Sequence, residues 1–242
     1  MVRGWPRTAA ELEEAQRALA AAAVRAAPWR PPDLAAVRVA AVYATYATGR
    51  PGPGEAGEPA WAGAALVRTG DPRHVLAEAA VRGETGAPYV AGLLALRCGA
   101  LLARAVGALE ERPDLLLVDA TARDHPRRAG LALHLGAQLD LPSLGVTNRP
   151  LVAAYQEPGA ERGETGSLTL DGEEVGCCLR TRSGSNPLIV HPGWRVDLET
   201  ARAIVLTLTH RRRTPEPLRR ARTLARVLRA RDEGRLPGEG VE

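Results

Sequence analysis

The sequence predicts an α/β fold: a single domain in which helices flank a mixed β-sheet. Two observations lead to this prediction. The chain has 242 residues, 45% of them hydrophobic and 25% charged, which is the balance of a globular domain. After an N-terminal helical segment come three strand-like segments, and helical segments then alternate with short apolar runs, an order typical of domains that mix parallel and antiparallel strands.

The first half of the chain begins with a predicted helix, where Thr8 and Glu11 have the spacing of a capping box and the following segment is rich in alanine. A strand is expected next, at 37–46, because β-branched and aromatic residues are frequent there. Residues 49–59 are rich in glycine and proline, so they form a loop before two antiparallel strands. The expected elements are a helix at 8–27 and strands at 37–46, 60–68 and 74–82.

In the second half, leucine and alanine recur at helical spacing over residues 92–110. The apolar runs 115–118 and 143–146 have the pattern of strands buried on both faces, and 125–140 between them has a helical pattern. Residues 156–166 are expected to be a loop. The remaining expected elements are a β-hairpin formed by 173–180 and 187–190, and helices at 198–209 and 218–232.

Three segments divide the chain by composition. Residues 1–32 form an N-terminal helical extension that ends in prolines, and residues 33–232 form the main domain. Residues 233–242 are a short Gly- and Pro-containing tail, which we expect to be flexible.

Composition restricts the classes of protein. The 32 basic residues are all arginine and exceed the 28 acidic ones, so the net charge is +4, which permits a polyanionic partner without requiring one. Three cysteines without a C-x-x-C pair exclude a multi-disulfide scaffold and argue against structural zinc. Because the N-terminus lacks a secretory signal and no apolar run reaches ~18 residues, we expect a cytoplasmic protein with no membrane span.

Asp119 is the most informative polar residue, since it directly follows the apolar run 115–118 and precedes a polar loop. Open α/β sheets bind ligands beyond the carboxyl ends of their strands. Asp119 is therefore a candidate metal ligand or acid–base carboxylate. A helix cap or a hydrogen-bonded structural acid explains the spacing equally well, and the pattern alone favours neither interpretation.

Four separate blocks carry a resemblance to a known family. They are Pro88–Arg97 (PYVAGLLALR), Asp114–Leu144 (DLLLVDATARDHPRRAGLALHLGAQLDLPSL), Gly176–Asp197 and Pro215–Arg219 (PEPLR). In these blocks and in their order, the chain resembles the endonuclease V family from about residue 33 to 228. The resemblance implies an RNase H-like fold, which agrees with the mixed sheet expected from the strand pattern.

Members of this family nick DNA near deoxyinosine or RNA near inosine. The resemblance implies metal-assisted hydrolysis, in which carboxylates hold a Mg²⁺ ion that polarises the phosphate and activates water. The four family ligand positions carry Tyr43, Cys98, Asp119 and Arg222 in this chain. Only Asp119 retains a residue type that the family uses as a metal ligand. An arginine nearby makes a poor Mg²⁺ site, because the ion would face a fixed positive charge. We therefore expect that the ancestral magnesium has been lost, together with the nuclease activity, and that no cofactor replaces it.

These four positions define a remodelled active site if the fold is kept. In one interpretation, Arg222 favours the thiolate of Cys98, and the site acts as an enzyme on a small molecule oriented by Tyr43 and Asp119. In the other, which we favour for Cys98, the thiol is a small buried hydrophobe, Tyr43 fills the vacated site and Arg222 pairs with Asp119. Asp124 or Glu84 could substitute as a ligand, although neither occupies a family ligand position.

Candidate nucleic-acid contacts come from the matched blocks and from the basic C-terminal region. They are Tyr89, Arg127, Arg128, Asn148, Arg211, Arg212 and Arg213. Tyr89 belongs to the family's wedge motif, whose second proline is Ala91 here, and Asn148 stands where the family has lysine. The arginine run would track phosphates. Alternatively, it is a solvated face in a protein whose basic residues are all arginine.

The sequence thus predicts an endonuclease V-like pseudoenzyme that binds DNA, RNA or a protein partner without efficient cleavage. Two alternatives remain open. One is a repurposed enzyme with a small-molecule substrate, working in the pocket around Cys98 and Asp119. The other is an active deoxyinosine endonuclease with an unusual ligand set.

Overall fold

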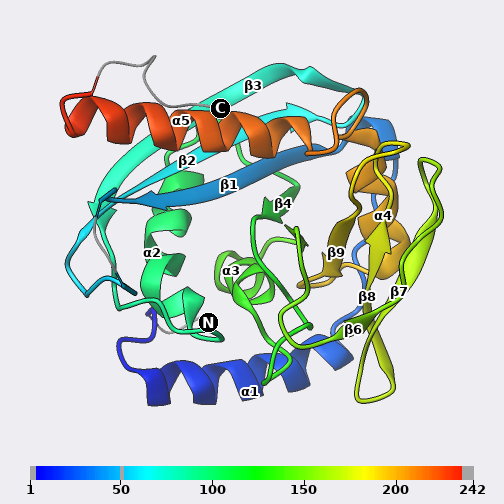
Figure 1. Ribbon diagram of the computed structural model, residues 1–242, viewed down its shortest axis with the longest axis horizontal. Helices are drawn as coiled ribbons and strands as arrows, with labels where there is room; N and C mark the ends of the chain where they lie inside the picture. The colour runs from blue at the N-terminus through cyan, green and yellow to red at the C-terminus, as the bar shows by residue number, and fades with distance from the viewer. Residues whose placement is uncertain (1–3, 50–51, 236–242) are drawn as a thin grey trace.

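The computed structural model describes residues 4–49 and 52–235 (Figure 1). Its centre is a nine-stranded mixed sheet with the strand order β3-β2-β1-β4-β5-β9-β8-β7-β6. The predicted single α/β domain with a mixed sheet is therefore confirmed. Within residues 4–49 and 52–235, we find no helix that combines the length and the hydrophobicity required to span a bilayer.

The first half of the sheet holds the strands around Asp119. Strands β1 (Arg38–Tyr46), β2 (Pro59–Arg68) and β3 (Asp71–Glu84) form an antiparallel meander. Strand β1 also pairs in parallel with β4 (Leu115–Val118), and β4 pairs in parallel with β5 (Ser143–Thr147). Because β1, β4 and β5 are parallel, their carboxyl ends meet at one edge, where ligands bind in such sheets.

The second half of the sheet is antiparallel throughout and extends from β5. Its strands are β9 (Leu188–Pro192), β8 (Glu173–Leu179), β7 (Thr165–Leu170) and β6 (Ala154–Tyr155). Cys177 and Cys178 are adjacent in β8 and pack on opposite faces, as the alternation of a strand requires. Strand β7 is not predicted by the sequence pattern, because Thr165–Leu170 lacks a sustained apolar alternation.

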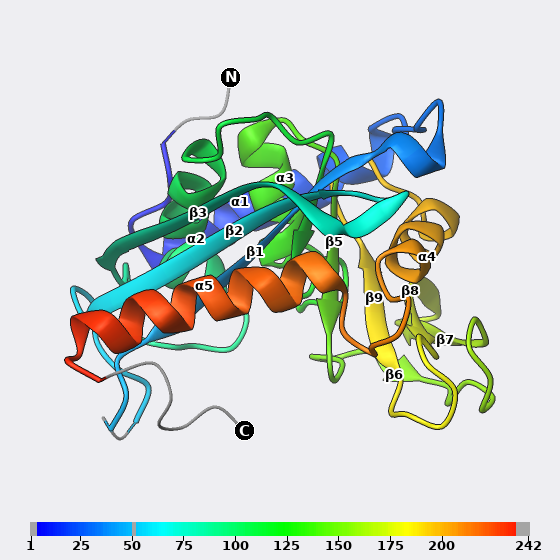
Figure 2. The same cartoon turned by 90° about the horizontal axis from the view of Figure 1, so that it is seen from above.

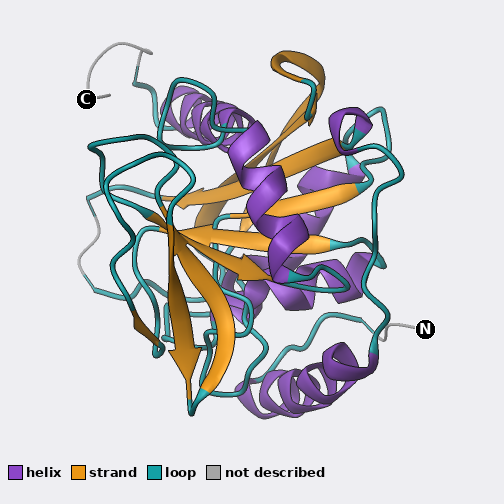
Figure 3. Cartoon of the chain, turned by 90° about the vertical axis from the view of Figure 1, so that its right-hand side faces the viewer, coloured by secondary structure: helices purple, strands orange, loops and turns teal. Residues whose placement is uncertain are grey.

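Helices cover both faces of the sheet, so each face has its own core cluster. Helices α1 to α3 pack on one face, with Leu12 of α1 fully buried, and α4 and α5 pack on the other (Figure 2). Figure 3 shows α1 and α5 on opposite sides of the strands. The helices are α1 (Ala9–Arg25), α2 (Leu94–Gly107), α3 (Leu131–Leu139), α4 (Leu198–Thr207) and α5 (Glu216–Asp232), with a short 3₁₀ turn at Leu34–Ala36.

The termini of two helices show where local sequence signals hold and where they fail. At α1, the Thr8 hydroxyl accepts a hydrogen bond from the Glu11 N–H at 3.2 Å, so the predicted N-cap is confirmed. The helix predicted from residue 125 begins only at Leu131. Arg128 has a φ of 57°, in the left-handed region, and this conformation prevents a continuous helix through the preceding turn. The predicted tail is described only as far as Arg235, and the rest of it lies outside the described residues.

Candidate active site

Asp119 and Arg222 form an ion pair at the carboxyl end of β4. Nη2 of Arg222 on α5 lies 2.9 Å from Oδ2 of Asp119, and its Nε lies 3.3 Å from the same oxygen. About a quarter of each side chain is exposed to solvent, 25% for Arg222 and 22% for Asp119. The predicted pairing is therefore present, in a partly buried position.

Tyr43 of β1 lies beside this pair. The guanidinium carbon of Arg222 is 5.5 Å from the centre of the Tyr43 ring, and that of Arg226 is 5.7 Å from it. Guanidinium groups at these distances are attracted to the electron-rich face of an aromatic ring. Three of the four positions at which the resemblance implies metal ligands thus come together, as an aromatic ring, a carboxylate and a cation.

Cys98 does not join this group, contrary to the interpretation that places all four residues in one pocket. Cys98 packs in the core beneath α1 to α3, whereas Tyr43 packs against the core on the α4 and α5 face. The Cys98 thiol lies 3.5 Å from the Leu94 carbonyl oxygen. Burial raises its pKa to about 11, and the neighbouring Tyr46 and Arg97 lower it only in part. A buried, protonated thiol is a poor nucleophile.

The residues present do not fit a magnesium site. Mg²⁺ requires oxygen ligands arranged around an octahedron, and the one carboxylate at the family position is already bound to a guanidinium. In the described ranges, no group of three or more His, Cys, Asp or Glu side chains could hold a metal ion. Asp124 is not a free carboxylate either, because its oxygens accept hydrogen bonds from the backbone N–H groups of residues 151–153 at 2.7–2.9 Å.

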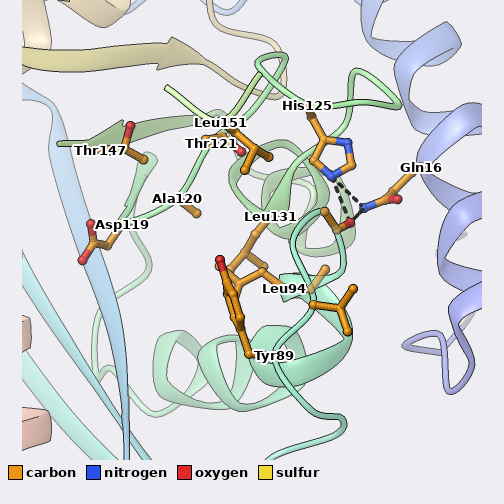
Figure 4. Close-up of a pocket in the computed structure, with 13 residues that line it drawn as sticks. Gln16, Tyr89, Leu94, Asp119, Ala120, Thr121, His125, Leu131, Thr147 and Leu151 are labelled. Carbon is orange, nitrogen blue, oxygen red and sulfur yellow. Dashed lines mark hydrogen bonds between the residues drawn. The ribbon is translucent and has the colours of Figure 1, made fainter. Parts of the chain in front are cut away.

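A cavity of about 170 Å³ opens beside Asp119 (Figure 4). Asp119 lies at one end of this Asp119 cavity, and Gln16 and His125 lie at the other, with Tyr89 along one side. Tyr89 is 53% exposed. The lining is mostly apolar with a few polar groups, which is typical of sites for small ligands or single bases. Its residues are Gln16, Tyr89, Val90, Gly92, Leu94, Ala95, Asp119, Ala120, Thr121, His125, Leu131, Thr147 and Leu151.

One backbone carbonyl organises the far end of the cavity. The Gly92 oxygen lies 2.9 Å from His125 Nε2, 3.0 Å from Gln16 Nε2 and 3.1 Å from Arg127 Nη2. Since a carbonyl only accepts, Nε2 of His125 carries the proton, and Nδ1 accepts from the Arg127 N–H at 3.1 Å. Burial lowers the pKa of His125 and so favours the neutral ring. Gln16 is a lining residue that no local motif indicates, because its contacts are far away in sequence.

The structure separates the predicted nucleic-acid contacts. Arg127 is directed inward, with its Nε 2.6 Å from Gln16 Oε1, and Arg128 pairs with Asp171 at 2.9 Å. Arg213 donates to Asn148 Oδ1 at 2.8 Å, and burial together with the charge of Arg222 lowers its pKa. Arg211 and Arg212 instead line a different groove together with arginines of β3 and α5. The predicted set is therefore not one continuous surface.

Comparisons with known proteins identify the family of this chain. A family model described as Endonuclease V matches residues 35–223. Endonuclease V of Streptomyces avermitilis is 40% identical over 223 residues, covering 92% of this chain and 93% of that protein. The endonuclease V of Streptomyces coelicolor is 39% identical over 224 residues, covering 93% and 92%.

Solved structures give the same answer. The S. avermitilis crystal structure superposes with a TM-score of 0.83 at 39% identity over 96% of each chain. The catalytic domain of human endonuclease V superposes with a TM-score of 0.81 at 28% identity over 95% of this chain and 99% of that one. The RNase H-like fold implied by the motifs is thus confirmed, and the chain belongs to the endonuclease V family.

Proposed function

We propose that this protein binds nucleic acid as a member of the endonuclease V family and does not cleave it. The ion pair between Asp119 and Arg222 carries this proposal. Phosphodiester hydrolysis by a Mg²⁺ ion depends on carboxylates that hold the ion against the phosphate. Here the carboxylate at the family position is neutralised by a cation of the protein itself.

Binding does not require the metal. Tyr89 is exposed beside the Asp119 cavity, where its ring can stack on a base, a contact typically worth ~1–3 kcal/mol. Endonuclease V of Ciona intestinalis has been crystallised with a DNA that contains an inosine followed by a ribo-adenosine. This relative is 19% identical and shares the fold. By extension, we expect the Asp119 cavity and its surroundings to bind a strand that contains a modified purine.

The location of Cys98 weakens the small-molecule alternative in its thiol form. A repurposed enzyme would need another nucleophile, and Asp119 is the one carboxylate among the residues lining the cavity. The cavity remains compatible with a small ligand or a single base, so binding assays must include both.

A nicking assay on deoxyinosine DNA and inosine RNA tests the proposal, with Mg²⁺ or Mn²⁺ present. We expect no cleavage above background, together with retained binding that weakens when Tyr89 is changed to Ala. Metal-dependent nicking that disappears in Asp119→Ala would refute the proposal and favour an active nuclease with a different ligand set. In calorimetric titration we likewise expect no micromolar Mg²⁺ or Mn²⁺ binding that depends on Asp119.

A further inference from the structure

A second basic site lies away from the Asp119 cavity. A groove of about 330 Å³ is formed by residues at the start of β3 and by the loop and first turns that lead into α5. Its basic residues are Arg73, His210, Arg211, Arg212, Arg219 and Arg220. We call this site the β3–α5 groove. Its volume far exceeds the ~30 Å³ that one water molecule occupies in the liquid, so phosphate-sized groups fit within it.

The charge of the groove is unbalanced. Glu216 lies within it, pairing with Arg219 at 2.7 Å and with Arg212 at 3.9 Å, and Glu78 pairs with Arg220. Five guanidinium groups against these two carboxylates leave a formal charge of +3 with His210 neutral. An excess of like charge in one concave site is self-repulsive, and a bound anion relieves that repulsion.

Two arginines of the groove, Arg73 and Arg211, are exposed and make no ion pair within the described residues. Elsewhere arginines are commonly paired, as Arg38 is with Asp114 at 2.8 Å and Arg128 is with Asp171 at 2.9 Å. Unpaired guanidinium groups beside ion-paired ones suit a ligand with several oxygens, because each guanidinium can donate two parallel hydrogen bonds to a phosphate.

Helix α5 connects this groove with Asp119. Arg219 and Arg222 are three residues apart, and Arg222 and Arg226 are four apart, so the three side chains are neighbours along one face of the helix. Arg222 reaches Asp119, whereas Arg219 lines the groove. A row of arginine side chains on α5 therefore leads from Asp119 into the β3–α5 groove.

We infer that the β3–α5 groove binds adjacent phosphate groups. The backbone of a nucleic-acid strand that extends beyond the cleft would supply them, and a free polyphosphate has the same chemistry. For the strand, this inference rests on the proposed function and extends its footprint past Asp119. For a free polyphosphate, it stands independently.

The test compares two double variants that remove equal charge. Arg73→Ala with Arg211→Ala removes the two unpaired groove arginines, and both are exposed, so the fold should tolerate their loss. Arg25→Ala with Arg112→Ala is the control, since both of its arginines are exposed and lie outside the groove. The probes are labelled single strands of about 4 and about 16 nucleotides, a range of lengths over which single-strand sites extend, and sodium tripolyphosphate.

We expect the groove variant to bind the long strand about tenfold more weakly at low salt, with the control like wild type. For this variant, the slope of log binding constant against log salt concentration should be shallower by about 1.4, which corresponds to two lost phosphate contacts on a single strand. Binding of the short strand should not change. Tripolyphosphate binding that only the groove variant loses, with no effect on the long strand, would identify a free polyphosphate as the ligand.

The outcomes also separate this inference from the proposed function. If no strand binds but the groove variant loses tripolyphosphate binding, the proposed function fails and the groove site stands. If strands bind through Tyr89 and the groove variant matches the control with every probe, the groove inference is overturned and the proposed function stands.

Discussion

The cavity side and the α5 side of Asp119 are held by different kinds of contact. On the cavity side, buried groups are fixed by backbone contacts, such as the Gly92 carbonyl with its three neighbouring donors and the Asp124 carboxylate with its three N–H partners. On the α5 side, side chains meet at the surface, with Arg222 between Asp119 and Tyr43. These contacts to backbone groups hold the buried side chains near the Asp119 cavity in fixed positions. On the α5 side, the Asp119 carboxylate is instead balanced by the guanidinium group of Arg222.

This contrast predicts that the cavity side governs stability and that the α5 side contributes little. Asp124→Ala should have the largest effect. It removes a fully buried carboxylate and leaves three backbone N–H groups without their acceptor, so we expect a loss of about 3–5 kcal/mol in the free energy of unfolding.

Denaturant unfolding measures this loss, and Asp171→Ala is the matched control. The Asp171 side chain is 81% exposed and pairs with Arg128, so its removal should cost less than about 1 kcal/mol. If the two variants were equally stable, the cavity side would not be held by Asp124.

Acid should weaken the cavity side next. Burial lowers the pKa of His134, which stacks on Trp5, and that of His191 to about 4 each, from an ordinary value of 6.5. Because the folded-state pKa is below the unfolded one, the stability is complete above pH 6.5 and is lost as the pH falls towards 4. Each histidine contributes up to about 3 kcal/mol to this loss.

His134→Phe sharpens the test, since phenylalanine can stack on Trp5 and does not titrate. The Nδ1 atom of His134 is buried without a hydrogen-bond partner in the described structure, so its removal should cost little at pH 7. We expect the fall in melting temperature between pH 7 and pH 4.5 to be smaller in the variant. An unchanged fall would exclude His134 as a source of acid sensitivity.

The Asp119–Arg222 pair should have a smaller effect on stability. Breaking a fully buried pair typically costs ~3–5 kcal/mol, whereas exposed pairs contribute ~0–1 kcal/mol. With about a quarter of each side chain exposed, we expect Arg222→Met to cost about 1 kcal/mol. A double-mutant cycle with Asp119→Asn isolates the coupling. A coupling of zero would show that the pair contributes nothing to the free energy of unfolding.

The sequence could predict much of the fold because most elements follow local patterns. The run 115–118 and the strand observed there coincide, and Thr8 caps its helix as expected. The site was harder to predict, because it depends on which face each side chain occupies. Tyr43 alternates with Val42 along β1, and that alternation places Tyr43 on the face opposite to the core around Cys98. The Gln16 contact spans 76 residues of sequence, so no local signal could indicate it.

Cys98 provides the smallest expected effect and the sharpest test of the division between the two sides. It is 3% exposed, and its pKa is raised from 9.0 to about 11, which lowers its thiolate fraction near neutral pH about a hundredfold. Alkylation by iodoacetamide, followed by peptide mass mapping, should therefore leave Cys98 unmodified in the native protein and modify it in denaturant. Arg222→Met should not change this, since the cation lies with Tyr43 and Asp119 and not with the thiol. Rapid native labelling that slows in Arg222→Met would place the thiol beside the arginine and restore the interpretation of a thiol-based enzyme.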